Sequence, residues 1–168
     1  GMGVLLAQYW GADDEHGLRR NFALGTTIST FASALLFAFC WFFPDVIPSL
    51  FKASGETAEL AANYLQIISV AILVAGPSIS MDAALRALGK TKTTMTMSII
   101  EIGLNVGLSF ILIFGYLGMP AMGLMGAGLG TVIARVLRVF MSVAVIYFLS
   151  PPLILGLRDF SFSSRIFN

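Results

Sequence analysis

The sequence predicts an all-α, polytopic membrane helix bundle, with about four full transmembrane helices and a truncated first one. Hydrophobic residues make up 57% of the chain and charged residues only 11%, whereas soluble domains average about 25% charged residues. The mean hydropathy is +0.88. A soluble protein of this length needs a polar shell that this chain lacks, so the lipid bilayer is the expected solvent.

The apolar segments follow one another along the chain and are separated by polar loops. The first ten residues are apolar but shorter than the roughly 20 residues of a helical span, so we expect them to end a membrane helix that begins before Gly1. Full spans are predicted at residues 22–43, 60–87, 94–117 and 122–150. Asp13 or Asp14 is expected near the N-cap of the first full span, and Pro44 and Pro48 are expected to end it.

The second full span contains an internal proline and a pair of opposite charges. Pro77 follows Gly76 and has no backbone N–H, so it predicts a kink. Such a break is tolerated where a neighbouring helix or water satisfies the freed carbonyl. Asp82 and Arg86 are four residues apart on one helix face, and a surface ion pair at the lipid headgroups is the interpretation we favour.

Basic residues predict the orientation of the chain in the membrane. Taken in order, the loops contain Arg19 and Arg20; then Lys52; then Arg86, Lys90 and Lys92; then no basic residue; then Arg158 and Arg165. The positive-inside rule therefore places the first, third and fifth loops in the cytoplasm. The tail, residues 151–168, mixes apolar and polar residues without a run long enough to span, so it is expected to lie at the interface or to lead into another helix.

Polar residues inside the third full span are functional candidates. Glu101, Asn105 and Ser109 are spaced by four and line one helix face. Inserting an ionisable group into the membrane costs about 3 kcal/mol on insertion scales, so Glu101 is a functional candidate by default. Gly103 and Gly107 lie on the opposite face, with the small-xxx-small spacing that lets helices approach closely.

The fourth full span carries a matching polar stripe, which includes Thr131 and Arg135, and it repeats the close-packing spacing at Gly126 and Gly130. In an antiparallel pair, residues whose numbers have equal sums lie at about the same depth. Glu101 is then level with Arg135, and Asn105 with Thr131. We predict that Glu101 and Arg135 form an ion pair or share a polar cavity. Arg138 is expected to snorkel to the cytoplasmic surface.

Two roles for Glu101 remain open: a structural ion pair, or a carboxylate that takes up a proton or sodium ion when the pair opens. Enzymatic functions are disfavoured. His16 is the only histidine, no histidine or cysteine cluster supports a metal site, and no GxxxxGK[ST] loop supports ATP binding. We therefore expect no catalytic residues, metal or cofactor. A net charge of +1 is too small to indicate nucleic-acid binding.

Three stretches together resemble the multidrug and toxic compound extrusion (MATE) family. They are LLAQYWGADD, ALRALGKTKTTM and LNVGLSFILIFGYLGMPAMGLMGAGLGTVIAR, and the stretch 104–135 is the most specific. The resemblance implies that residues 1–150 are part of an N-terminal lobe, from the end of helix 2 through helix 6. It also implies that residues 151–168 begin the linker between the lobes, with the remaining helices of the parent transporter as partners.

That family exports small cationic, amphipathic compounds across the inner membrane in exchange for sodium ions or protons. The resemblance makes Asn105 and Thr131 cavity residues. The chain departs from the family pattern at Ser109, where some members have an aspartate that binds the coupling ion. Two alternatives remain: a flippase of the same superfamily that moves lipid-linked sugars, and a truncated bundle that transports nothing.

Overall fold

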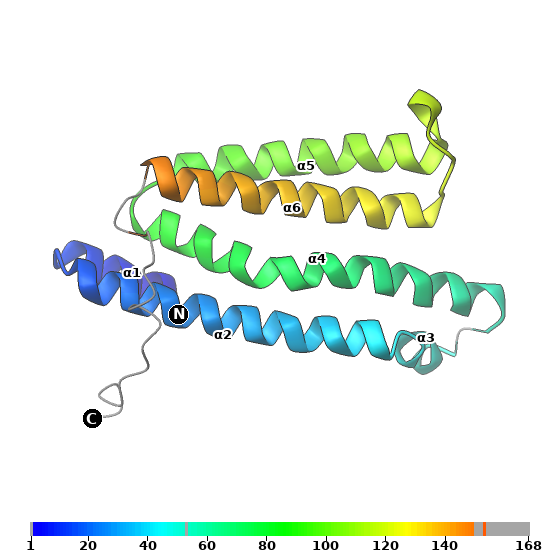
Figure 1. Cartoon of the computed structure of the whole chain (residues 1–168), viewed down its shortest axis with the longest axis horizontal. Coiled ribbons are helices and arrows are strands. Elements are labelled where there is room, and N and C mark those ends of the chain that lie inside the picture. Colours follow the sequence, from blue (N-terminus) through cyan, green and yellow to red (C-terminus); the bar gives the residue numbers. More distant parts are fainter. Residues whose placement is uncertain (1, 53, 150–152, 154–168) are drawn as a thin grey trace.

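The structure is a computed structural model that describes residues 2–52, 54–149 and 153. Within these residues the chain is helical and contains no strand (Figure 1). The elements are α1 (Met2–Gly11), α2 (Glu15–Phe42), α3 (Val46–Leu50), α4 (Glu56–Ala87), α5 (Thr91–Phe114), the 3-10 helix η1 (Tyr116–Gly118) and α6 (Leu124–Leu149).

The predicted fold class is confirmed. Among the described residues, α2, α4, α5 and α6 are long and apolar enough to cross a membrane. The spans predicted from the sequence fall on these helices, although α2 begins earlier, at Glu15. Helix α5 ends earlier than predicted, at Phe114, because Gly115 adopts a left-handed conformation with φ of 73° and caps it. The short helix α3 was not predicted.

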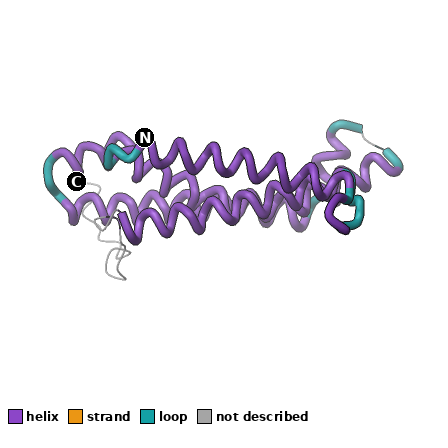
Figure 2. Tube along the Cα trace, turned by 90° about the horizontal axis from the view of Figure 1, so that it is seen from above, coloured by secondary structure: helices purple, strands orange, loops and turns teal. Residues whose placement is uncertain are grey.

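The long helices lie side by side in the order α2, α4, α6, α5 (Figure 1). Helix α1 packs against α2 and α4. The α1–α2 and α4–α5 turns share one end of the bundle, whereas the α2–α4 and α5–α6 connections share the other (Figures 1 and 2). The chain is thus serially antiparallel, as the alternation of basic residues requires.

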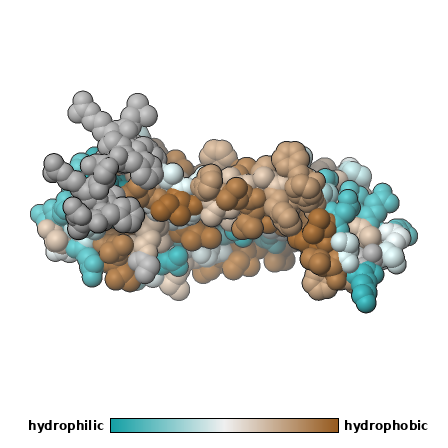
Figure 3. Space-filling view, turned by 90° about the horizontal axis from the view of Figure 1, so that it is seen from below, coloured by the Kyte–Doolittle hydropathy of each residue, from teal (hydrophilic) through white to brown (hydrophobic). Residues whose placement is uncertain are grey.

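The surface of the bundle is apolar along its middle. Large side chains such as Phe31, Ile99 and Phe140 are exposed there. Figure 3 shows hydrophobic residues over the central part of one face and hydrophilic residues towards both ends. A soluble protein rarely exposes so much contiguous apolar surface. The chain is a membrane protein.

A buried apolar cluster joins the helices at the end that holds the α1–α2 turn. It includes Leu6 of α1, Leu18 and Phe22 of α2, Leu85 of α4 and Ile146 of α6. The turn above it is closed by Asp14, whose carboxylate accepts a hydrogen bond from the backbone N–H of Gly17 at 2.9 Å. Of the two predicted N-cap residues, Asp14 therefore takes the role.

Helix α4 runs through Pro77 without ending, and its C-terminal part runs at a slant to the rest (Figure 1). The freed carbonyl is that of Leu73. The hydroxyl of Ser33 on α2 lies 3.1 Å from this carbonyl and 2.9 Å from that of Thr30 within α2, so its one hydrogen is shared between the two acceptors. A neighbouring helix thus satisfies the carbonyl, as predicted. A Cβ on Gly76 would clash with Ser29 and Ser33, so a glycine before Pro77 lets α2 approach this closely.

The predicted tail, residues 151–168, lies outside the described residues except for Leu153, which is buried. Ser150, the predicted end of the last span, also lies outside them. Cys40 is a buried free thiol, in agreement with its apolar surroundings in the sequence.

Candidate functional site

Glu101 on α5 and Arg135 on α6 form the ion pair that the antiparallel register predicts. Glu101 Oε1 lies 2.9 Å from Arg135 Nε. The two atoms are in ionic contact, although the N–H is not aligned for a hydrogen bond. The side chains are 22% and 35% exposed respectively, so the pair borders the open side of the hairpin rather than its sealed core.

One turn further along, Asn105 and Thr131 also meet, as their equal depth predicts. The Asn105 amide Nδ2 donates to Thr131 Oγ1 at 3.0 Å. The Thr131 hydroxyl in turn donates to the backbone carbonyl of Ala127 at 3.0 Å. Donor and acceptor are both half-buried. This bond and the ion pair form two successive polar rungs between α5 and α6.

Ser109 lies at the third position of the predicted stripe, where the two helices touch. A Cβ on Gly130 would lie 2.8 Å from the backbone nitrogen of Ser109, and a Cβ on Gly126 would lie 2.6 Å from the carbonyl carbon of Leu112. Gly126 and Gly130 therefore permit the close approach that their spacing predicts. Ser109 is half-buried in this contact.

The prediction that Gly103 and Gly107 pack against a neighbouring helix is not met within the described residues. Both glycines are exposed, and no described atom lies within 4 Å of a Cβ built on either one. Helix α6 instead approaches α5 on the face that buries Thr94, Met97 and Leu112. The spacing marks a face that allows close approach, but it does not identify a neighbour.

The prediction that Arg138 snorkels to the membrane surface is wrong. Its side chain is 2% exposed and lies between α4 and α5. Its guanidinium NH2 lies 2.7 Å from Asp82 Oδ2, while NH1 donates to Ser98 Oγ at 3.0 Å and to Glu101 Oε2 at 3.4 Å. Arg138 stays inside the bundle because two carboxylates and a hydroxyl there can pair with its guanidinium.

The prediction of a surface pair between Asp82 and Arg86 is also wrong. The Asp82 carboxylate points to Arg138, and Arg86 Nε donates to the backbone carbonyl of Asp82 at 3.2 Å instead. Asp82 belongs to the site and was missed as a member of it. The sequence could have predicted Ser98 as a partner of Arg138 on α5, because their residue numbers have the same sum as those of the two polar rungs.

Asp82, Ser98, Glu101, Arg135 and Arg138 together form what we call the arginine cluster. It contains two guanidinium groups and two carboxylates, so its formal charge is zero. Its side chains range from 2% exposed at Arg138, through 19% at Asp82 and 22% at Glu101, to 35% at Arg135. One side of the cluster is therefore sealed, and the other lies open at the surface of the described residues.

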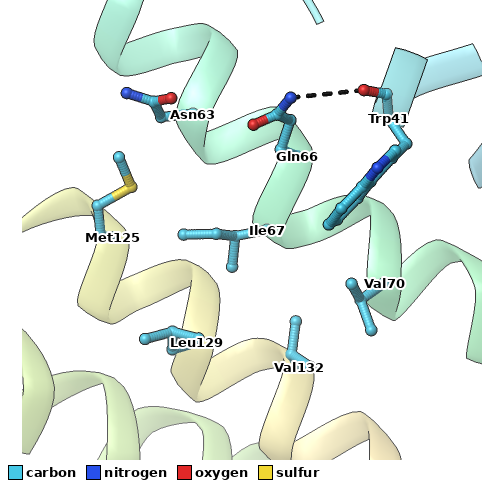
Figure 4. Close-up of a pocket in the computed structure, with 8 residues that line it drawn as sticks. All are labelled: Trp41, Asn63, Gln66, Ile67, Val70, Met125, Leu129 and Val132. Carbon is cyan, nitrogen blue, oxygen red and sulfur yellow. Dashed lines mark hydrogen bonds between the residues drawn. The ribbon is translucent and has the colours of Figure 1, made fainter.

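A cavity of about 340 Å³ lies between α2, α4 and α6, towards the α5–α6 connection (Figure 4). It was not predicted. Its lining residues are Trp41, Asn63, Gln66, Ile67, Val70, Met125, Leu129 and Val132. The wall is mostly apolar, and Asn63 and Gln66 supply amide groups; Gln66 Nε2 donates to the backbone carbonyl of Trp41 at 3.4 Å. Within the residues described, no group of three His, Cys, Asp or Glu side chains could hold a metal ion.

Two solved structures share the fold. One is described as the inward-facing conformation of a multidrug resistance MATE family transporter of the MOP superfamily. It matches with a TM-score of 0.85 at 22% identity, over 97% of this chain and 36% of that one. The other, described as the outward-facing conformation of such a transporter, matches with a TM-score of 0.81 at 23% identity over the same shares. At these identities the likeness shows the fold alone.

Sequence similarity identifies the family. The probable multidrug resistance protein NorM of Listeria monocytogenes serovar 1/2a is 30% identical over 146 residues, or 84% of this chain and 31% of that protein. The protein of that name from Bacillus cereus is 36% identical over 73 residues, 44% of this chain and 16% of that protein. The chain spans about a third of the length of the first relative. A family model described as MatE matches residues 1–111, which include Glu101, Asn105 and Ser109. The chain belongs to the MatE family.

Proposed function

We propose that this chain forms part of a multidrug efflux transporter of the inner membrane, coupled to the entry of sodium ions or protons. The observation that carries the proposal is Glu101, a carboxylate on a membrane-length helix whose Oε1 atom lies 2.9 Å from Arg135 Nε. Ionisable groups inside a membrane mark ion and substrate pathways. Membership of the MatE family and relatives named as multidrug resistance proteins support the same function.

The coupling step proposed here is an exchange of cations at Glu101. The carboxylate needs a positive partner in this environment, and Arg135 is the one on the exposed side. A proton or sodium ion that reaches Glu101 substitutes for the guanidinium and releases Arg135. Arg135 lies against Glu101 when no other cation is bound there, and it moves away when a proton or sodium ion binds. Cation binding therefore shifts the equilibrium between these two conformations. Oxygen atoms of Asn105 and Thr131 lie one turn away and suit a hard cation.

The exported compounds proposed are small, cationic and amphipathic. The cavity lined by Trp41, Gln66 and Met125 provides an aromatic face, an amide and a polarisable thioether (Figure 4). Such a wall binds the apolar body of an amphipathic cation and attracts its charge through the indole ring. The half-exposed polar rungs of α5 and α6 are proposed to face further helices of a longer protein, since the relatives are about three times as long.

A lipid-linked sugar flippase is a weaker candidate. Such a substrate carries phosphate, which requires surplus positive charge at the site. In the arginine cluster, the charges of Arg135 and Arg138 are balanced by those of Glu101 and Asp82. No surplus charge is left within the cluster for a phosphate group.

The test is a drug-resistance assay on the complete product of the natural gene, expressed in a bacterial strain without its own drug exporters. We expect the wild type to raise the inhibitory concentrations of ethidium and norfloxacin. Glu101→Gln should abolish this resistance at an unchanged amount of membrane protein. Glu59→Gln, an exposed carboxylate at the start of α4, is the matched control and should retain it.

The assay separates the alternatives. Full resistance with Glu101→Gln would make the ion pair merely structural. If the wild type gives no resistance to any compound tested, the chain belongs to a bundle that does not export drugs.

A further inference from the structure

The two arginines that contact Glu101 are held very differently. Arg138 Nη atoms contact Asp82 Oδ2 at 2.7 Å, Ser98 Oγ at 3.0 Å and the Thr94 carbonyl at 3.4 Å, besides Glu101 Oε2 at 3.4 Å. Among the residues that the structure describes, Arg135 has its ionic contact with Glu101 Oε1 and no aligned hydrogen bond from Nε. A side chain held by four contacts from two helices has far less freedom than one held by a single ion pair.

The two arginines also differ in burial, and the one with more contacts is the more buried. The side chain of Arg138 is 2% exposed and that of Arg135 is 35% exposed. A guanidinium that stays charged and loses its carboxylate needs another polar partner, and Arg135 lies on the open side of the hairpin, which we propose faces further helices of a longer protein. Arg138 cannot reach a new partner without opening the packing between α4, α5 and α6, and leaving a buried charge unpaired is strongly unfavourable.

Asp82 completes the arrangement from a third helix. Its contact with Arg138 is shorter than the contact that Glu101 makes, 2.7 Å against 3.4 Å. Arg138 therefore keeps a counter-ion of its own on α4 whatever happens at Glu101. The charged groups around Glu101, among the residues described, are Arg135 and Arg138 from α6 and, through Arg138, Asp82 from α4.

We propose that Arg138, held by Asp82, is a positioning residue that fixes one oxygen of Glu101, and that Arg135 is the partner that a cation displaces from the other. The inference deepens the proposed function, since it takes Glu101 as the cation-responsive carboxylate. Binding of one positive charge leaves the neutral cluster with a surplus charge. Arg135 carries that surplus away from Glu101 on the open side of the hairpin, while Asp82 keeps Arg138 neutralised and the three helices together.

The proposal predicts opposite effects for substitutions that otherwise look alike. Without Asp82, the buried Arg138 depends on Glu101 as its counter-ion. A proton or sodium ion that binds Glu101 must then compete with Arg138 as well as with Arg135. Without Arg135, the cation meets no exchangeable competitor.

The experiment uses the complete gene product in proteoliposomes, with ethidium transport as the readout. The half-saturating concentration of sodium ions is measured at fixed pH, and the midpoint of the pH dependence is measured at fixed sodium concentration. For whichever cation drives transport, we expect Asp82→Asn to weaken the apparent affinity about tenfold or more. Arg135→Gln should strengthen it, and Asp82→Asn combined with Arg138→Gln should return it towards the wild-type value. Glu59→Gln should leave it unchanged.

A second measurement does not depend on transport. In detergent, Arg138→Gln should lower the Tm more than Arg135→Gln, and the double variant Asp82→Asn/Arg138→Gln should be less destabilised than the sum of its single changes. The proposal is overturned if Asp82→Asn and Arg135→Gln shift cation affinity in the same direction, or if the two arginine variants are equally destabilised. If the wild type shows no cation-driven transport, the exchange falls with the proposed function. The Tm order then decides alone whether Arg138 is the fixed arginine.

Discussion

The hydroxyl of Ser33 on α2 donates a hydrogen bond to the carbonyl of Leu73 on α4, at 3.1 Å. This carbonyl lies four residues before Pro77, whose ring nitrogen has no hydrogen to offer it. The bond joins two long helices at the position where one of them has lost an internal bond. A proline that weakens α4 by itself is thus part of what fixes α4 against α2.

We predict that Ser33→Ala destabilises the protein by about 1 kcal/mol, because the Leu73 carbonyl is left without a donor. In a Pro77→Ala background the same change should cost less, since the new backbone N–H can reach Leu73. Reversible unfolding in mixed detergent measures both values. Ser29→Ala is the control: both hydroxyls bond a carbonyl three residues earlier in α2, but of the two only that of Ser33 also reaches α4. Equal losses in the two backgrounds would contradict the assignment.

Gly130 on α6, which faces α5, and Gly107 on the exposed face of α5 should respond differently to a methyl group. A Cβ on Gly130 would lie 2.8 Å from the Ser109 nitrogen, so Gly130→Ala should cost about 1 to 2 kcal/mol as the helices move apart. Gly107→Ala meets no described atom within 4 Å and should be neutral or slightly stabilising. Thermal unfolding of the purified variants tests the difference. An equal loss at Gly107 would show that another segment packs there.

The hydrogen bond between Asn105 and Thr131 should matter for export. Thr131→Val removes the acceptor at 3.0 Å from the amide and leaves a half-buried amide unpaired, at a cost of about 1 kcal/mol. We expect lower ethidium export from cells with equal amounts of the protein in their membranes. Thr131→Ser keeps the hydroxyl and should keep the export. Full export from Thr131→Val would contradict the assignment, and loss of export from Thr131→Ser would show that the hydroxyl alone does not account for the role of Thr131.

The orientation inferred from basic residues can be measured by labelling. In a Cys40→Ser background, Met119→Cys places a thiol in the α5–α6 connection, and Lys92→Cys places one in the α4–α5 turn. Both positions are exposed. A maleimide that cannot cross the membrane should label Met119→Cys in intact cells, and Lys92→Cys only after the membrane is opened. The reverse pattern would invert the topology.

The parts of the site that could be predicted follow from the hairpin. Helices α5 and α6 are consecutive, antiparallel and joined by a short connection, so residue numbers alone fix which side chains share a depth. Glu101 with Arg135 and Asn105 with Thr131 follow from that relation. The four long helices follow from the length and hydropathy of the apolar segments.

The rest depended on contacts between helices that are not consecutive. Arg138 was expected at the surface, although Ser98 lies at the same depth in its own hairpin. Its main counter-ion, Asp82, lies on α4, and their contact depends on how α4 packs against α6. Position along the chain does not fix that packing. The same holds for Gly103 and Gly107, whose spacing is right for a contact that no described helix makes.

The central claim is that a cation replaces Arg135 at Glu101 as drugs are exported. The most direct measurement records sodium and proton movement in proteoliposomes of the complete gene product when ethidium is added. We predict that the drug releases one of these cations from wild-type vesicles and releases none from vesicles containing Glu101→Gln. Cation release of equal size from the two preparations would contradict the account.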